Sequence, residues 1–448
     1  MTTKKFAKIK LSFIIPTAVV LFFISIYAAS SIIRRDARAL LIQDIEYMHQ
    51  TLKDNFALYE FAYQAEGVDI SSRLNWVRRA VTVIPFMGER GLHIALTVAL
   101  APLNNIGHFS IVTHRQYNDM TTNFHSLQRL RLSPSGLARL RYPHVENFYS
   151  SRRNNAQMGA LSISQLFTPI TVYADTLHPN IDRNIEISIR YEERIAYISI
   201  ASFTNFFLPT WRSEQSAIFD FFEEVQDFEH LIVDIRGNTG GGVQYFIEAF
   251  VQPNISESIR LDAYVFLVYG EYSAEFTSPL YNREFNRGTS PIPIDRELRP
   301  FYQMFEQFSL PEFNLDDAKR FQYGFRSRKS ISPGFQSRFN NQPAFDGYIW
   351  LLVDESNGSG AQIAAWIAKE SGFATLVGDV TGGNYGGPVA LVALPNTGIL
   401  FQFDVFYVTD HRGRSFEAGT TPHYSNFPRA DAFETVLQII GERRALNR

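Results

Sequence analysis

The stretch GYIWLLVDESNGSGAQIAAWIAKESGFATLVGDVTGGNYGGP, from Gly347 to Pro388, decides the fold expected of this chain. Its pattern predicts a strand, a loop, a helix, a second strand and a second loop. Tyr348 to Val353 is a short apolar run, typical of a strand buried on both faces. A helix is predicted to begin at Ser359, because small and apolar residues then recur at helical spacing and Gly372 suits a helix C-cap.

Ser359 is therefore expected at the N-terminus of a helix that follows a buried parallel strand. Free backbone N–H groups and the positive end of the helix dipole favour negative charge there, including a developing oxyanion. The structural alternative is that Ser359 only caps the helix. Residues elsewhere in the chain must distinguish the two interpretations.

The composition indicates a large globular body. The chain has 448 residues, enough for two or three domains, with 45% hydrophobic and 19% charged residues. The net charge is −3 and no basic block lies outside the N-terminus, so nucleic-acid binding is not predicted. The chain has no cysteine, which excludes a thiol nucleophile, disulfides and zinc sites built on cysteine. No cofactor or metal motif is predicted.

The first residues have the pattern of a membrane-targeting segment. Residues 1–10 form a basic tail with four lysines, and residues 11–29 carry no charge. Nineteen apolar or small residues are about enough to span a bilayer, so we expect a transmembrane signal anchor at 11–29. A cleaved signal peptide ending near Ala29 and a buried core helix are the alternatives. With an anchor or a signal peptide, the body lies on the extracytoplasmic side, periplasmic or extracellular.

Residues 36–113 are predicted to form a small helical subdomain. His108 follows an Asn-Asn-Ile-Gly turn and leads into a strand-like segment, a position where a side chain can face a cleft. Residues 114–190 show no clear period and are expected to be β-rich or irregular. The apolar faces of two expected helices consist of Leu40, Ile45, Met48, Leu52 and Phe56, and of Leu74, Val77, Ala80 and Val81.

Residues 191–448 are predicted to form an α/β core. A strand at 195–200, a helix at 213–228 and a strand at 231–235 favour a parallel sheet with right-handed crossovers. The loop RGNTGGG at 236–242 lacks the lysine of a phosphate loop, so its glycines instead offer backbone N–H groups to a ligand. Asp234 and Arg236, at the end of the strand, are expected to make structural contacts.

Two strand, glycine-loop and helix units in one parallel sheet place both loops at the carboxyl edge of that sheet. Gly240 to Gly242 and Ser359 are therefore expected to face one crevice, and a third unit at 374–388 reaches the same edge. Residues 271–343 are expected to be a long irregular insertion that shapes this crevice. Strands at 389–393 and 400–408 and a helix from Asp431 complete the predicted core.

Four segments, LNNIGHFSIV, LIVDIRGNTGGG, FDGYIWLLVDESNGSGAQIAAWI and ATLVGDVTGG, occur in this order along the chain. Together they resemble the C-terminal-processing or tail-specific serine peptidases, a family with tricorn-core and retinoid-binding relatives. The resemblance implies a ClpP/crotonase-like fold, with a parallel sheet flanked by helices, Ser359 as nucleophile and His108 as general base. It covers most of residues 38–440.

The sequence departs from this family at two positions. Asn384 stands where the bacterial processing branch has a lysine base, so a Ser–Lys pair is not predicted. The tricorn-like branch uses serine and histidine assisted by a second serine and a glutamate. Gly107 stands at the assisting serine, and Glu417 matches the glutamate with an offset of about one residue. No segment has the pattern of a PDZ domain.

The sequence therefore predicts a membrane-anchored, extracytoplasmic serine endopeptidase that acts on peptides or proteins. His108 would take the proton from Ser359 as the hydroxyl attacks a peptide carbonyl. Backbone N–H groups of Gly240 or Gly241 and of Gly360 would hold the oxyanion, each worth about 3 kcal/mol. The oligomeric state is not predicted.

Two alternatives of other classes stay open. The first is an inactive family member that binds a peptide or an apolar ligand, since the lysine and the assisting serine are missing. Its 39 phenylalanines could line an apolar cleft or simply fill the core. The second is a hydrolase of non-peptide substrates, because a fold does not fix a substrate.

Overall fold

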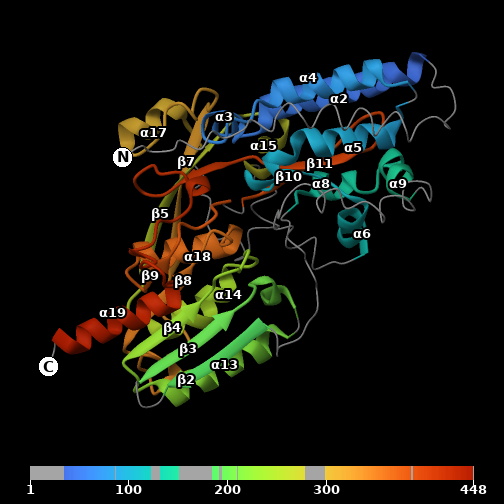
Figure 1. Ribbon diagram of the computed structural model, residues 1–448. Helices are drawn as coiled ribbons and strands as arrows, with labels where there is room; N and C mark the ends of the chain where they lie inside the picture. The colour runs from blue at the N-terminus through green and yellow to red at the C-terminus, as the bar shows by residue number, and fades with distance from the viewer. Residues whose placement is uncertain are drawn as a thin grey trace, which may run out of the picture.

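A six-stranded sheet contains the strands predicted from the central stretch (Figure 1). The computed structural model describes residues 35–85, 87–122, 132–150, 184–190, 194–208, 210–277, 298–384 and 387–446. Across this sheet the strands are β13 (Tyr424–Ser425), β9 (Thr375–Gly378), β8 (Tyr348–Val353), β4 (His230–Asp234), β3 (Ile195–Ile200) and β2 (Ile185–Arg190). All neighbouring pairs are parallel except β2 and β3. The parallel sheet expected from the strand and helix order is therefore confirmed.

The register of this sheet brings the carboxyl ends of β4 and β8 together. Asp234 pairs with Leu352, so the loops that follow the two strands start side by side. Both faces of the sheet are covered, which explains why β8 is apolar at consecutive positions. Leu351 and Val353 pack in the core with helix α18 (Ser359–Glu370) and helix α13 (Trp211–Val225). Trp350 and Leu352 pack with the C-terminal helix α19 (Ala432–Leu446).

Two smaller antiparallel sheets complete the β structure. One has the order β1 (Ser110–Ile111), β11 (Leu400–Asp404) and β10 (Val389–Ala393). The other has the order β12 (Tyr407–Thr409), β5 (Ile259–Leu267), β7 (Tyr323–Ile331) and β6 (Arg299–Pro300). The strand predicted at 400–408 is thus split into β11 and β12, which pair in different sheets.

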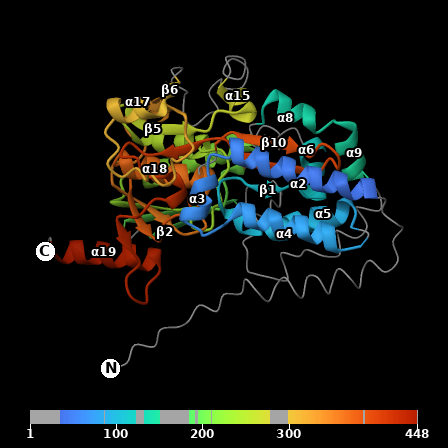
Figure 2. The same ribbon diagram turned by 90° about the horizontal axis from the view of Figure 1, so that it is seen from above.

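The helical subdomain is present between residues 35 and 100. It consists of α2 (Arg35–Asn55), α3 (Tyr59–Gln64), α4 (Ile70–Val83) and α5 (Glu89–Leu100). The Asp69 carboxylate caps α4 by accepting a hydrogen bond from Ser72 N–H. The predicted apolar faces are buried, except that Leu40 is exposed and Ala80 is half-buried. Figures 1 and 2 show α2, α4 and α5 at the opposite end of the molecule from α19.

Two segments differ from their predicted structure. The described residues from 114 to 150 form helices rather than strands, namely α6 (His114–Thr122), α8 (Pro134–Arg139) and α9 (Pro143–Ser150). Residues 151–183 of the expected β-rich or irregular segment lie outside the described residues, and Ile185–Arg190 form β2. The insertion at 271–343 is also more regular than expected, with α15 (Glu271–Thr277), α17 (Phe301–Gln307), β6 and β7.

The long strand β7 explains why the insertion is ordered. It pairs with β5 over nine residues, and buried and accessible side chains alternate along its second half. Phenylalanines of the insertion pack on Phe266 of β5, with the ring centroids of Phe266 and Phe313 4.8 Å apart. These rings fill a core, as one of the two interpretations of the high phenylalanine content expected.

Short 3₁₀ segments occur at Ala101–Asn105, Thr204–Phe207, Gln252–Asn254, Gln336–Phe339 and Phe416–Ala418. The helix predicted after the glycine loop is α14 (Gln244–Phe246), which continues as a π-helical turn at Ile247–Val251.

Among the described residues, no helix combines the length and the apolar character needed to cross a bilayer. The predicted anchor at 11–29 lies outside them.

Candidate active site

Ser359 lies on a strained turn between β8 and α18. It has a φ of +49°, in the left-handed region that costs a residue other than glycine about 1–3 kcal/mol. Its N–H donates to the carbonyl oxygen of Asn384 at 2.7 Å and lies 3.3 Å from that of Gly383. A serine held on a strained strand-to-helix turn is typical of nucleophiles in α/β hydrolytic enzymes. Gly383 and Asn384 belong to the loop that follows β9, called the third loop below. Their carbonyl groups keep Ser359 in this conformation.

The glycine loop after β4 packs directly against this turn. A Cβ atom on Gly240 would lie 2.7 Å from Gly358 O and 2.8 Å from Gly360 N, and one on Gly360 would lie 2.3 Å from Gly241 O. Gly240 and Gly241 also have φ angles of +111° and +120°. Only glycine therefore permits this approach and this backbone conformation. The predicted meeting of the two loops at one sheet edge is observed.

Two buried asparagines fix the shape of the loops. Asn357 Nδ2 donates to Ile235 O and Asn238 O, while its Oδ1 accepts from Asp354 N–H. Asn238 Nδ2 donates to Ile200 O, and its Oδ1 accepts from Gly240 N–H at 2.8 Å. These side chains supply the hydrogen bonds that the loop backbone lacks.

The backbone N–H groups near Ser359 are not equally available to a ligand. Gly240 N–H is used by Asn238, and Ser359 N–H by the third loop. Among the hydrogen bonds of the described residues, none is donated by Gly241 N–H or Gly360 N–H. Gly241 lies in the glycine loop and Gly360 in the first turn of α18, and the two residues are in direct contact.

His108 is held by a carboxylate that sequence analysis missed. Its Nδ1 lies 2.9 Å from Asp404 Oδ1 and 3.1 Å from Oδ2. Asp404 is 1% exposed, whereas the His108 side chain retains 23% of its accessible surface. The pairing of Ser110 with Gln402, extended by two residues, sets His108 opposite Asp404, and Gln402 Nε2 also donates to His108 O. A carboxylate on Nδ1 orients the imidazole ring and stabilises its protonated form.

The signal for Asp404 was present but ambiguous in the sequence. Within the single strand predicted at 400–408, an aspartate reads as an interior residue of the strand. In the structure it is the last residue of β11 and is buried. An acidic residue within an otherwise apolar strand could have indicated a buried partner.

Glu417 contacts the backbone beside His108. Its Oε2 accepts a hydrogen bond from Gly107 N–H at 2.9 Å. Gly107 has a φ of +56°, and a Cβ atom there would lie 2.7 Å from Leu58 Cδ1 and 2.9 Å from Asp404 Oδ2. Asp404 thus occupies the space that a side chain at the family's assisting-serine position would need.

A chain of contacts links the Ser359 and His108 turns. Gly383, whose carbonyl faces Ser359 N–H, packs so closely on Glu417 that an added Cβ would lie 2.2 Å from Glu417 O. Glu417 in turn holds Gly107, the residue before His108. Asn384, at the family's lysine position, is buried, and its Oδ1 has no hydrogen-bond partner within the described chain.

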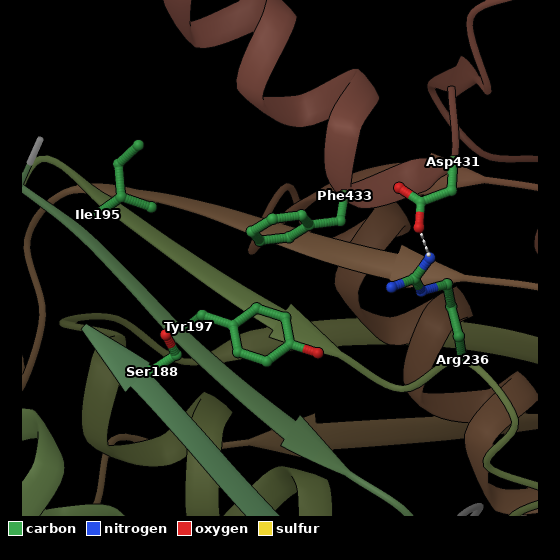
Figure 3. Close-up of a pocket in the computed structure, with 6 residues that line it drawn as sticks. All are labelled: Ser188, Ile195, Tyr197, Arg236, Asp431 and Phe433. Atoms are coloured by element: carbon green, nitrogen blue, oxygen red, sulfur yellow. Dashed lines mark hydrogen bonds and ion pairs between the residues drawn. The ribbon is translucent and has the colours of Figure 1, made fainter. Parts of the chain in front are cut away.

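A cavity of about 290 Å³ lies on the face of the six-stranded sheet that α19 covers (Figure 3). Arg236 borders it and donates to Asp234 and Asp431, and these contacts raise the Arg236 pKa. The Tyr197 hydroxyl donates to Asp234, and burial together with this carboxylate raises the Tyr197 pKa to about 12. Asp234 and Arg236 thus make the structural contacts that were expected. The cavity is lined by Ser188, Ile195, Tyr197, Arg236, Asp431 and Phe433.

Comparisons with known proteins bear on the fold and the family of the chain. Curated proteins gave no match. Among solved structures, a candidate peptidase from Parabacteroides merdae is 14% identical, with a TM-score of 0.50, over 89% of this chain and 96% of its own. Mature CPAF complexed with lactacystin is 12% identical, with a TM-score of 0.50, over 92% of this chain and 98% of its own. These two likenesses support the fold. The family model "Peptidase family S41" matches residues 194–426, more than half of the chain. The chain therefore belongs to peptidase family S41, the serine peptidase family that its motifs resemble.

Proposed function

We propose that the protein is an active serine endopeptidase in which Ser359, His108 and Asp404 form a catalytic triad. The observation that carries the proposal is the 2.9 Å contact between His108 Nδ1 and the buried Asp404. It supplies the group that orients His108, which the missing assisting serine would otherwise leave absent. The strained Ser359 turn and the close glycine loops support the same assignment.

The reaction proceeds by acyl transfer. Ser359 Oγ attacks the peptide carbonyl carbon while His108 Nε2 takes the hydroxyl proton, and Asp404 stabilises the imidazolium that forms. The carbonyl oxygen becomes an oxyanion, which accepts hydrogen bonds from Gly241 N–H and Gly360 N–H. Collapse breaks the C–N bond, and His108 gives its proton to the leaving amine. A water molecule then hydrolyses the acyl-enzyme, with His108 again as base.

Glu417 and Gly240 have supporting roles in this proposal. Glu417 holds the Gly107 backbone and so fixes the turn that carries His108. Gly240 allows the two loops to approach, while its own N–H is used by Asn238. The oxyanion site is therefore assigned to Gly241 and Gly360.

The test is covalent labelling of the purified protein with a fluorophosphonate probe. We expect labelling of the native chain and none of Ser359→Ala. Asp404→Asn should label about 10²- to 10⁴-fold more slowly, because the amide stabilises the wrong imidazole tautomer and no imidazolium. Asp410→Asn is the matched control, since Asp410 is also a buried carboxylate near the end of a strand. Absence of Ser359-dependent labelling in the native protein would overturn the proposal.

The competing function is that of an inactive peptide-binding module, which Asn384 and Gly107 favour because both replace family catalytic residues. Peptide binding alone does not separate the two functions, because an active peptidase and its Ser359→Ala variant can both bind a peptide. Cleavage of the peptide is therefore followed by mass spectrometry. Cleavage that is lost in Ser359→Ala supports the peptidase, whereas binding with no cleavage by the native chain supports the module. Cleavage of esters but not of peptides would indicate a non-peptide hydrolase.

We further propose that residues 11–29 anchor the protein in a membrane, with the body on the extracytoplasmic side. The support is the uncharged run of nineteen residues after a lysine-rich tail. The full chain should stay with membranes during alkaline carbonate extraction, and a variant lacking residues 1–34 should be soluble. Protease added outside the intact cell or spheroplast should digest the body. Release of the uncleaved full chain by carbonate would contradict the anchor.

A further inference from the structure

Three buried polar side chains lie behind the Ser359 turn and bind one another. They are Gln362 of α18, Thr381 of the third loop and Thr420 of the segment after Glu417, with exposures of 1%, 4% and 7%. Thr381 Oγ1 donates to Gln362 Oε1, and Gln362 Nε2 donates to Thr420 Oγ1 at 3.1 Å. Thr420 N–H donates to Thr381 Oγ1 at 2.7 Å. We refer to these three residues as the polar cluster.

Each residue of the polar cluster belongs to a segment that contacts the active site. Gln362 is on the first turn of the helix that begins at Ser359. Thr381 precedes Gly383 and Asn384, whose carbonyls face Ser359 N–H. Thr420 follows Glu417, which holds the backbone beside His108. The polar cluster therefore connects the nucleophile turn with both segments that position it and its base.

The backbone around the polar cluster leaves little freedom for these segments. Thr381 N–H donates to Thr420 O at 3.2 Å. A Cβ atom on Gly419 would lie 2.0 Å from Thr381 O. Losing a hydroxyl of the polar cluster leaves a buried donor or acceptor unpaired, which favours a shift of one segment against another.

We propose that Gln362, Thr381 and Thr420 are positioning residues for the reaction at Ser359. This inference rests on the proposed function, because it concerns the same site. The polar cluster sets the distance between the Asn384 and Gly383 carbonyls, which hold Ser359 in its left-handed conformation, and the Glu417 carboxylate, which holds the His108 turn. It touches neither substrate nor the reacting atoms.

The test compares Thr381→Val with Thr381→Ser. Valine matches threonine in shape but removes the hydroxyl that both donates and accepts, whereas serine keeps it. We expect the maximal rate of fluorophosphonate labelling to fall about tenfold in Thr381→Val, with the half-saturating probe concentration unchanged. Thr381→Ser should stay within about twofold of the native rate. A purely structural role would change the melting temperature without this effect on the maximal rate.

Gln362→Leu gives a second measurement, and Gln215→Leu is its matched control. Gln215 is also a buried helical glutamine, but it bonds Arg212 and Glu248 on the α13 side of the molecule. Gln362→Leu should slow labelling about tenfold, and Gln215→Leu should not. If native protein is labelled while Thr381→Val reacts at the native rate, this inference fails and the proposed function stands. If native protein is not labelled at Ser359, the proposed function itself fails.

Discussion

At the scale of single residues, Gly107 lies where its backbone conformation and close neighbours favour glycine. The backbone is left-handed there, and a Cβ atom could be added only if the nearby Leu58 or Asp404 side chain moved. Asp404 instead reaches His108 from a different strand. Asp404, far from His108 in the sequence, thus takes the role of orienting the imidazole that the assisting serine has in the family.

Gly107→Ser should therefore impair the protein rather than restore a family feature. The new side chain would push Asp404 away from His108, so we expect Ser359 labelling to slow at least tenfold. Gly67→Ser is the matched control, because Gly67 has a φ of +64° but nothing within 4 Å of an added Cβ. That control should lose about 1 kcal/mol of unfolding free energy and keep the native labelling rate. Faster labelling of Gly107→Ser would show that a serine can assist here and would contradict the steric argument.

At the scale of elements, local patterns predicted the parallel strands well. β4, β8 and β9 are buried on both faces, so their composition alone identifies them. The helix from Ser359 and the meeting of the two glycine loops followed from the same periodicity and from the rule on sheet edges. The candidate nucleophile and its loop neighbours could thus be located from sequence.

The strands beside His108 were predicted as well, at 389–393 and within 400–408, but their pairing with β1 was not, because long-range contacts define it. The turn between β10 and β11 is held by Asp44 of α2, whose buried carboxylate accepts from Asn396 N–H and Thr397 N–H. β5 ends at Leu267 and pairs with β7, which begins only at Tyr323, within the insertion. Strand pairing over such separations depends on partners that no local window contains.

At the scale of the whole molecule, the helical layer packs against the segment that follows His108. His93 of α5 is buried, and its Nε2 lies 2.9 Å from Val112 O, just beyond β1. Its ring packs near His114 and Phe148, at centroid distances of 6.2 and 5.5 Å. Protonation of His93 would therefore place a charge between the helical layer and the segment that follows His108.

The stability of the protein should consequently fall in acid. Burial lowers the pKa of His93 from 6.5 to about 4, so the unfolded chain binds this proton more tightly than the folded chain. The contribution of His93 is fully present above pH 6.5 and is lost progressively as the pH falls to about 4, by about 3 kcal/mol in total. The pH dependence of the unfolding free energy is measured by urea unfolding of native protein and of His93→Gln between pH 7.5 and about 4. Glutamine is chosen because it keeps a donor for Val112 but does not titrate. As the pH falls below 6.5, the unfolding free energy of the native protein should decrease relative to that of the variant. A difference that is constant across this range would show that His93 has the same pKa in the folded and the unfolded chain.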